Sequence, residues 1–278
     1  MGRRLFLFAA YTPSGDVGDA LLWYLRALAA LGDVVFCDDA PLGPGEEERL
    51  MPFVLHCEAL KHGEYDFGSY KRDFVWASAN LKLEEYDFVY LVNDSVFGPL
   101  SDLKPLLEGL EAGPHGAFGL VYKPGRHGSH LQSWFVGLHR EVFLSGYFRE
   151  FLLGVRPAGG KGTVCELYET GLSRLLVSHG VELGYVFTAP HKTIYNNPGR
   201  LVRQGLPFIK KSAFTRHNGC LGREIAGILR DCPSEASEAI LSEAAELWGK
   251  DFAHRLTTMT WSQSKLLYFK YLLGKFRN

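Results

Sequence analysis

Two patterns of apolar and polar residues alternate along the first half of the chain. Short, almost continuous apolar runs predict buried strands at 4–10, 33–37, 87–92, 117–121 and 131–138. Between them, apolar residues at helical spacing predict helices at 19–32, from Lys71 to about Leu83, and at 101–110. Strands that alternate with helices are typical of an α/β fold: a mostly parallel sheet with helices on both faces.

The second half of the chain changes to helical patterns alone. We expect helices at 140–153, 165–179, 223–231 and 234–248, and a basic tail after Trp261. No composition break marks a linker. The sequence therefore predicts one α/β domain over 1–222, with a helical extension over 223–278 packed on it.

Polar residues follow three of the predicted strands. Tyr11–Ser14 follow the first strand, Asp38 and Asp39 the second, and Asn93–Asp94–Ser95 the strand at 87–92. Ligands of such sheets bind beyond the carboxyl ends of the strands, so these residues form a candidate site. Alternatively, Asp94 starts an Asx turn towards Pro99.

The segment "YDFGSYK" at 65–71 has two interpretations. Asp66 can accept hydrogen bonds from hydroxyl groups or a base, Gly68 permits close backbone approach, and Lys71 opens a helix whose amino end favours phosphate. The other interpretation is the cap of a surface helix. The chain lacks the glycine-rich dinucleotide motif, the P-loop and the GxSxG motif.

Charge narrows the choice of partners. The net charge of −1 argues against nucleic acid as a partner, because nucleic-acid binding normally requires a basic surface. The segment from Leu183 to Arg223 nevertheless has no acidic residue and contains seven basic ones, which predicts contact with an anion: Lys192, Arg200, Arg203, Lys210, Lys211, Arg216 and Arg223.

Neither the cysteines nor the histidines form a metal-binding pattern. The five cysteines are widely spaced and never arranged as CxxC, which favours a reducing cytosol. His127, His130 and His139 fit no zinc spacing and are interpreted as loop histidines. No apolar run reaches the length of a membrane span.

Six segments in a fixed order make the chain resemble the rhamnan synthesis protein F family: "YDFGSYK", "LVNDSVFGPL", "LQSWFV", "YETGLSRLLVSHG", "YNNP" and "PFIKK". The resemblance covers roughly residues 4–215. It implies a GT-A-like glycosyltransferase of bacterial surface polysaccharide synthesis. Such an enzyme uses a nucleotide-diphosphate sugar as donor and a glycan, free or linked to a lipid, as acceptor; the sugar would be rhamnose or a related deoxysugar.

In the GT-A fold an acidic strand end holds a divalent cation against the diphosphate. Here that place is taken by "NDS", in which Asp94 is flanked by the neutral Asn93 and Ser95, and one carboxylate is a poor ligand set for Mg²⁺ or Mn²⁺. A metal is therefore not expected to be essential. Lys210, Lys211 or Arg216, together with Lys71, would neutralise the diphosphate instead.

The resemblance also implies roles for single residues. Glu169, one turn from Glu166 on a predicted helix, becomes the preferred general base, with Asp94 as the alternative. Gln132 and Ser133 would hold sugar hydroxyl groups, and Trp134, alternating with Ser133, would face the core. The remaining donor contacts are assigned to Tyr11, Asp38, Asp66, Gly68, Ser69, Asn93 and Ser95. The rival function is a non-catalytic scaffold of a polysaccharide-assembly complex.

The basic tail predicts a possible partner surface. In a helix, Leu266, Phe269, Leu272, Leu273 and Phe276 fall on one arc. Residues 263–278 could hold a cytoplasmic enzyme peripherally at the inner membrane surface through anionic headgroups. The alternative is that this arc packs on the protein's own core.

Overall fold

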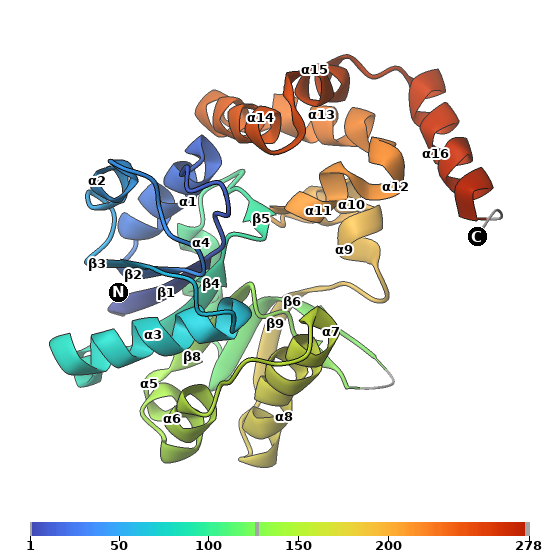
Figure 1. The fold of residues 1–278 in the computed structure, drawn as a ribbon. Helices are drawn as coiled ribbons and strands as arrows, with labels where there is room; N and C mark the ends of the chain where they lie inside the picture. The colour runs from blue at the N-terminus through green and yellow to red at the C-terminus, as the bar shows by residue number, and fades with distance from the viewer. Residues whose placement is uncertain (1, 126–127, 276–278) are drawn as a thin grey trace. The chain divides into compact units, whose positions relative to one another are not determined.

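The computed structural model describes residues 2–125 and 128–275. The chain forms two compact units (Figure 1). The first comprises residues 1–17, 25–94 and 104–191, and the second comprises residues 18–24, 95–103 and 192–278. The boundary predicted after residue 222 falls inside the second unit, and a helical extension over 223–278 packed on the α/β domain stays a prediction.

Within the described residues, the first unit is built on an eight-stranded sheet with the order β3-β2-β1-β4-β8-β6-β7, in which β9 also pairs with β6. Strands β1, β2, β3 and β4 are parallel, and β6 and β9 run in the same direction; β7 and β8 run against them. The strands are β1 (Arg4–Ala10), β2 (Asp33–Asp38), β3 (His56–Ala59), β4 (Phe88–Asn93), β6 (Ala117–Lys123), β7 (His130–Leu131), β8 (Phe135–His139) and β9 (Leu183–Thr188).

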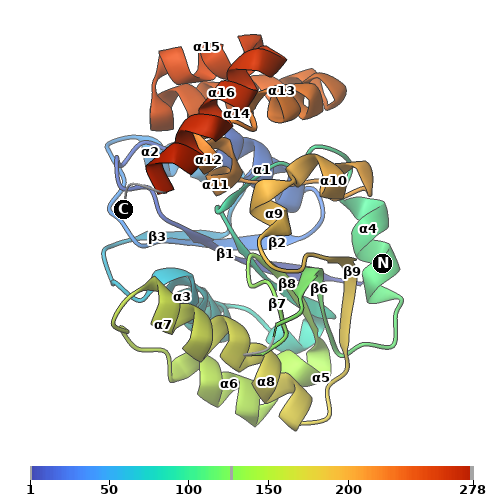
Figure 2. The ribbon, with the colours of Figure 1, turned by 90° about the vertical axis from the view of Figure 1, so that its right-hand side faces the viewer.

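Helices cover both faces of this sheet. Figure 2 shows α3, α5, α6 and α8 on one face, while Figure 1 shows α4 and the end of α1 on the other. The helical segments of this unit are α2 (Glu46–Leu50), α3 (Tyr65–Asn80), η1 (Leu83–Glu85), α4 (Lys104–Glu111), α5 (Arg140–Phe143), α6 (Gly146–Leu153), α7 (Lys161–Val164), the π-helical turn η2 (Cys165–Thr170) and α8 (Gly171–Ser178); α1 (Asp19–Ala29) begins in the second unit and ends in the first.

Burial in the core explains why the strands appear as apolar runs in the sequence. Every residue of β1 and β4 is buried. Leu5, Leu7 and Ala9 of β1 face the cluster that includes Phe67 and Phe74 of α3. On the other face Phe6 stacks on Tyr90 and Phe8 on Phe36. The predicted mostly parallel α/β fold with helices on both faces, followed by a helical C-terminal part, is confirmed.

The second unit is mainly helical and has its own core. Phe97, Leu100, Ile209, Phe214 and Ile240 belong to one buried cluster. Its helices are α9 (Thr193–Asn196), α10 (Pro198–Arg203), α11 (Lys211–Phe214), α12 (Arg216–Gly219), α13 (Gly222–Asp231), α14 (Ser234–Trp248), α15 (Lys250–Thr258) and α16 (Trp261–Lys275); β5 (Val96–Phe97) pairs with β10 (Ile209–Lys210).

Several segments differ from the sequence-based prediction. Helix α3 begins at Tyr65, so Lys71 lies in its second turn and does not open it. The predicted strand 131–138 is interrupted at 132–134. Strand β9 and helix α15 were not predicted, and α2 lies in a segment interpreted as loop. In the described parts of the chain, no helix combines the length and the hydropathy needed to cross a membrane.

Candidate functional site

The strand register brings three polar strand ends together at one edge of the main sheet. Ala9 of β1 pairs with Asn93 of β4, and Ala10 pairs with Asp38 of β2. The chain leaves β1 at Tyr11, between these two neighbours. The carboxyl ends of the parallel strands therefore form the edge predicted from the sequence, which we call the carboxyl edge.

Two carboxylates accept hydrogen bonds from the backbone just after β1. The Thr12 N–H donates to Asp38 Oδ1 at 3.0 Å, and the Tyr11 N–H donates to Asp94 Oδ2 at 3.4 Å. Asp38 is fully buried and its Oδ2 has no hydrogen-bond partner among the described residues. Burial raises the pKa of Asp38, and the nearby charge of Asp94 raises it further.

The same edge carries an exposed aromatic side chain. The Tyr11 side chain is 53% exposed, and the Lys61 ammonium lies 4.9 Å from the centre of its ring. Beside it, the Asn93 Nδ2 donates to Asp66 Oδ2 at 2.9 Å, which fixes the amide and the carboxylate against each other. An aromatic face with an adjacent cation and fixed polar groups suits a nucleotide or a sugar.

Glu169 lies on the π-helical turn η2, a wide turn of a kind that often occurs at functional sites. Its Oε1 accepts from the Ser133 N–H at 2.9 Å and from the Ser133 Oγ–H at 3.0 Å. Ser133 is itself held, because the Tyr70 hydroxyl donates to its carbonyl oxygen at 3.0 Å. The carboxylate is therefore fixed in position while its side chain stays 19% exposed.

His130 faces the second oxygen of this carboxylate. Its Nε2 lies 3.6 Å from Glu169 Oε2 and makes no hydrogen bond within the described residues. Its Nδ1 lies 3.1 Å from the carbonyl oxygen of Gly128, and the residue is only 5% exposed. His130 and His139 lie in strands and not in loops; His127 is outside the described residues.

Hydrogen bonds connect Glu169 to the carboxyl edge: the Asn93 N–H donates to the carbonyl oxygen of Trp134 at 3.2 Å, and the preceding residue, Ser133, donates to Glu169. Burial raises the pKa of the Cys165 thiol, and the charge of Glu169 raises it further. The charges of Lys161, Asp66 and Lys123 act on the same thiol. Charges from α3, β6, α7 and η2 thus influence the pKa of this one thiol.

Three residues of the "YDFGSYK" segment face the protein interior. A Cβ on Gly68 would lie 2.3 Å from the Cβ of Glu64, so close packing accounts for this glycine. Ser69 is fully buried, with its hydroxyl 3.1 Å from His62 Nε2. The Lys71 ammonium donates to Glu64 and to the carbonyl oxygen of Val155. These contacts argue against direct donor binding by the three residues.

The strand break at 132–134 changes the interpretation of two more residues. Gln132 is buried and its Oε1 accepts from the Trp134 Nε1–H at 2.8 Å, so the amide oxygen is already occupied. Trp134 is buried as expected. The expected reason, alternation along a strand, is wrong, because no strand covers this position.

Three of the seven predicted basic residues, Lys210, Lys211 and Arg216, make hydrogen bonds within the second unit. The Lys210 ammonium donates to Ser95 Oγ at 2.8 Å, and the Lys211 ammonium donates to Glu243 Oε1 at 2.6 Å. The Arg216 Nε–H donates to Asn196 Oδ1 at 2.7 Å. Lys211 therefore has a structural partner, whereas donor binding by Lys210 stays a prediction.

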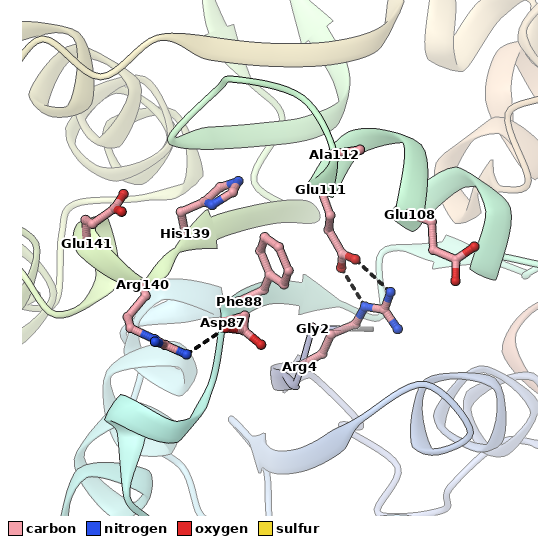
Figure 3. A pocket seen from close by; sticks show the side chains of 10 residues that line it. All are labelled: Gly2, Arg4, Asp87, Phe88, Glu108, Glu111, Ala112, His139, Arg140 and Glu141. Atoms are coloured by element: carbon pink, nitrogen blue, oxygen red, sulfur yellow. Dashed lines mark hydrogen bonds and ion pairs between the residues drawn. The ribbon is translucent and has the colours of Figure 1, made fainter.

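A pocket of about 680 Å³ opens at the opposite, amino edge of the same sheet (Figure 3). Its lining residues come from the starts of β1 and β4, the end of β8, and α4 and α5: Gly2, Arg4, Asp87, Phe88, Glu108, Glu111, Ala112, His139, Arg140 and Glu141. The Arg4 guanidinium donates two hydrogen bonds to Glu111, and Arg140 donates to Asp87. Both arginines that line this pocket are thus paired with carboxylates of its own lining.

Residues 34–268 match the family model described as rhamnan synthesis protein F, which covers most of the chain. The chain belongs to the rhamnan synthesis protein F family. Membership indicates a nucleotide-sugar glycosyltransferase of polysaccharide synthesis, in agreement with the order of motifs along the sequence. No curated protein matches the chain significantly.

Solved structures similar to this chain share little of its sequence. A protein described as a nucleotide-diphospho-sugar transferase, from Desulfovibrio desulfuricans G20, is 16% identical with a TM-score of 0.40, over 83% of this chain and 98% of that one. Residues 1–349 of TarS of S. aureus are 9% identical with a TM-score of 0.36, over 92% and 90% of the two chains. Core-mannan synthase A of Aspergillus fumigatus, in its Mn/GDP form, is 7% identical with a TM-score of 0.32, over 66% and 73%.

The donor atoms at the carboxyl edge do not fit a metal cage made by the protein alone. Mg²⁺ and Mn²⁺ favour several oxygen ligands, of which carboxylates are the strongest. Asp94 is one such ligand, but its neighbour Asp38 is buried with a raised pKa, which favours the neutral acid. Among the described residues, no group of three or more His, Cys, Asp or Glu side chains is arranged to hold a metal ion.

Sequence reasoning missed three residues of this edge. Lys123 ends strand β6, so the rule that located Asp94 could also have located it. Lys61 follows β3, a strand too short and too polar to be predicted. His130 gave no local signal, because its partner Glu169 lies 39 positions further along the chain.

Proposed function

We propose that this chain is a glycosyltransferase that moves a sugar, rhamnose or a related deoxysugar, from a nucleotide-diphosphate donor to the growing glycan of a cell-surface polysaccharide. The observation that carries the proposal is the fixed carboxylate of Glu169, placed near Asp66 and the carboxyl edge in a member of this family. A carboxylate held in this way suits a general base.

We assign the donor to the carboxyl edge. Tyr11 offers its exposed face to the base or the sugar, and Asn93, Asp94 and Asp66 offer acceptors and an amide for hydroxyl groups. Lys61, Lys123 and Lys161 supply positive charge that would stabilise the diphosphate as it leaves. Asp38 accepts the hydrogen bond of the Thr12 N–H, which fixes the backbone after β1, and takes no part in the chemistry.

In the reaction that we propose, the acceptor hydroxyl oxygen attacks the anomeric carbon of the donor. Glu169 takes the hydroxyl proton as the new glycosidic bond forms. The bond from the anomeric carbon to the diphosphate oxygen breaks, and the nucleoside diphosphate leaves with that electron pair. Ser133 keeps Oε1 in place through two hydrogen bonds, so that Oε2 is oriented for the proton.

We propose that no divalent metal is required, since Asp94 is the only half-exposed carboxylate of the strand ends beside Tyr11. Asp94 would be the ligand if a cation nevertheless accompanies the diphosphate. A glycan acceptor linked to a lipid would bring the reaction to the cytoplasmic surface of the inner membrane.

The proposal is tested by a thermal-shift panel of UDP, dTDP and GDP sugars with and without Mn²⁺, followed by a transfer assay with the stabilising donor. One nucleotide should stabilise the protein by roughly 2.7 kcal/mol at a hundredfold excess over Kd. Release of that nucleoside diphosphate should require a glycan acceptor. Binding without hydrolysis or transfer would favour the non-catalytic scaffold, and no binding of any donor would contradict the proposal.

A further inference from the structure

Helix α16 exposes apolar side chains to solvent on the face that does not contact the protein. Trp261 is 59% exposed, Leu266 53%, Phe269 57% and Leu273 48%. At 100° per residue these four side chains fall within one arc of 140°. A surface helix of a globular protein normally presents charged and polar residues on its outer face, so this helix is unusual.

The opposite face of α16 explains how the helix is held. The Ser264 hydroxyl donates to the carbonyl oxygen of Cys220. The rings of Tyr268 and Tyr271 lie 5.6 Å and 4.2 Å from the imidazole of His217. The helix is thus attached to α12 by one face, and core packing does not account for Leu266, Phe269 and Leu273.

The charges around the exposed face are basic. Lys265 and Lys270 are exposed and lie within and beside the apolar arc, and the Lys265 ammonium is 3.5 Å from the centre of the Trp261 ring. No Asp or Glu follows Asp251 in the sequence.

Glu224 of the neighbouring helix α13 is engaged elsewhere. Glu224 accepts a hydrogen bond from the Gly199 N–H, on the side of α10. An apolar arc interspersed with lysines complements a negatively charged apolar interface, where acyl chains meet anionic headgroups. A tryptophan at the start of such a helix suits the headgroup level.

We propose that the exposed face of α16, formed by Trp261, Lys265, Leu266, Phe269, Lys270 and Leu273, docks on the surface of an anionic phospholipid bilayer. The occupant is the membrane surface itself, and the helix lies in its plane. This surface is separate from the carboxyl edge and does not depend on the proposed transfer reaction.

The test is co-sedimentation of the full chain with two kinds of vesicle. One is pure phosphatidylcholine, and the other contains about one third phosphatidylglycerol. We expect partition onto the anionic vesicles only, and its loss in high salt. Equal partition onto both kinds, or no partition onto either, would overturn the proposal.

Two double variants separate the charge from the apolar face. Lys265→Gln/Lys270→Gln should lower the partition coefficient on anionic vesicles about 25-fold, since each basic residue near the surface contributes about fivefold. The matched control is Lys82→Gln/Lys104→Gln, which removes two exposed lysines of the first unit and should change nothing.

Phe269→Ser/Leu273→Ser should weaken partition by at least about tenfold, because binding scales with the buried apolar area. The control Val75→Ser/Val177→Ser removes side chains of the first unit that are 50% and 59% exposed. All four double variants should keep the thermal midpoint of the wild type. Unchanged partition of either α16 variant would overturn the proposal, as would a concentration-dependent dimer in sedimentation velocity that Phe269→Ser/Leu273→Ser abolishes.

Discussion

At the amino edge of the main sheet, Arg4 donates two hydrogen bonds to Glu111, and the Tyr90 hydroxyl donates to the same carboxylate. At the carboxyl edge, Asp38 and Asp94 accept from backbone N–H groups, and Glu169 accepts from Ser133. The amino edge thus pairs its opposite charges internally. At the carboxyl edge, backbone N–H groups and the Ser133 hydroxyl hold these carboxylates, while Asp39 pairs with Lys61 at 3.2 Å.

The comparison teaches that a well-formed pocket is not by itself the better candidate site. The amino-edge pocket is lined by Arg4, Asp87, Glu111 and Arg140, whose charges are already compensated (Figure 3). A ligand there would have to break ion pairs. Buried polar atoms without a hydrogen-bond partner among the described residues occur at both edges: Asp38 Oδ2 and His130 Nε2 at the carboxyl edge, and His139 Nε2 at the amino edge. The ion pairs, and not such atoms, therefore distinguish the two edges.

We expect the largest effect on turnover from removing the carboxylate at the carboxyl end of strand β4, with the carboxylate before its amino end as the control. Asp94→Ala should abolish transfer while the fold survives, because this half-exposed carboxylate lies at the strand end and not in the core. The matched control is Asp87→Ala, just before the other end of the strand, which should keep wild-type turnover. Turnover is measured as release of nucleoside diphosphate. Wild-type rates from folded Asp94→Ala would remove this residue from the mechanism.

We expect the second-largest effect on turnover from the proposed general base, Glu169. Glu169→Gln should lower turnover by about 100-fold or more with donor affinity unchanged, since the amide keeps one acceptor for Ser133 but cannot take a proton. Glu166→Gln, an exposed residue of the same turn, is the control and should have no effect. A parallel loss of donor affinity would make Glu169 a binding residue.

At the amino edge the expected effect is on stability and not on rate. Glu111→Gln leaves the buried Arg4 charge without its counter-ion and should lower the free energy of unfolding by about 3 kcal/mol. Urea denaturation measures this loss. Turnover per folded molecule should stay within about twofold of the wild type, and a specific loss of donor binding would instead make the amino edge functional.

The smallest expected effect is that of a chelator. EDTA should change turnover by less than about twofold, because the strand ends beside Tyr11 offer one half-exposed carboxylate to a cation. Rates are compared after dialysis against EDTA, before and after addition of Mn²⁺. Complete loss in EDTA with restoration by Mn²⁺ would contradict this expectation.

Much of the carboxyl edge could be predicted because local pattern determines it. Buried strands produce apolar runs, and the polar residues that end them, such as Asp38 and Asp94, are readable from the sequence alone. Glu169 came from the family resemblance. Without it, a helical glutamate is indistinguishable from a solvated one.

The rest depends on contacts between distant segments. Glu64 and Lys71 pair across two turns of α3 only because the helix begins earlier than its apolar period suggests. The burial of Ser69 against His62 has no signature in the sequence. His130 meets Glu169 only after the sheet and the π-helical turn have come together.

Hydrogen exchange with the stabilising nucleotide sugar tests the central claim, that the donor binds at the carboxyl edge, most directly. Peptides covering Tyr11–Thr12, Asp38–Asp39 and Asn93–Asp94 should gain protection, while peptides covering 2–4, 108–112 and 139–141 at the amino edge should not change. Protection confined to the amino edge would contradict the account.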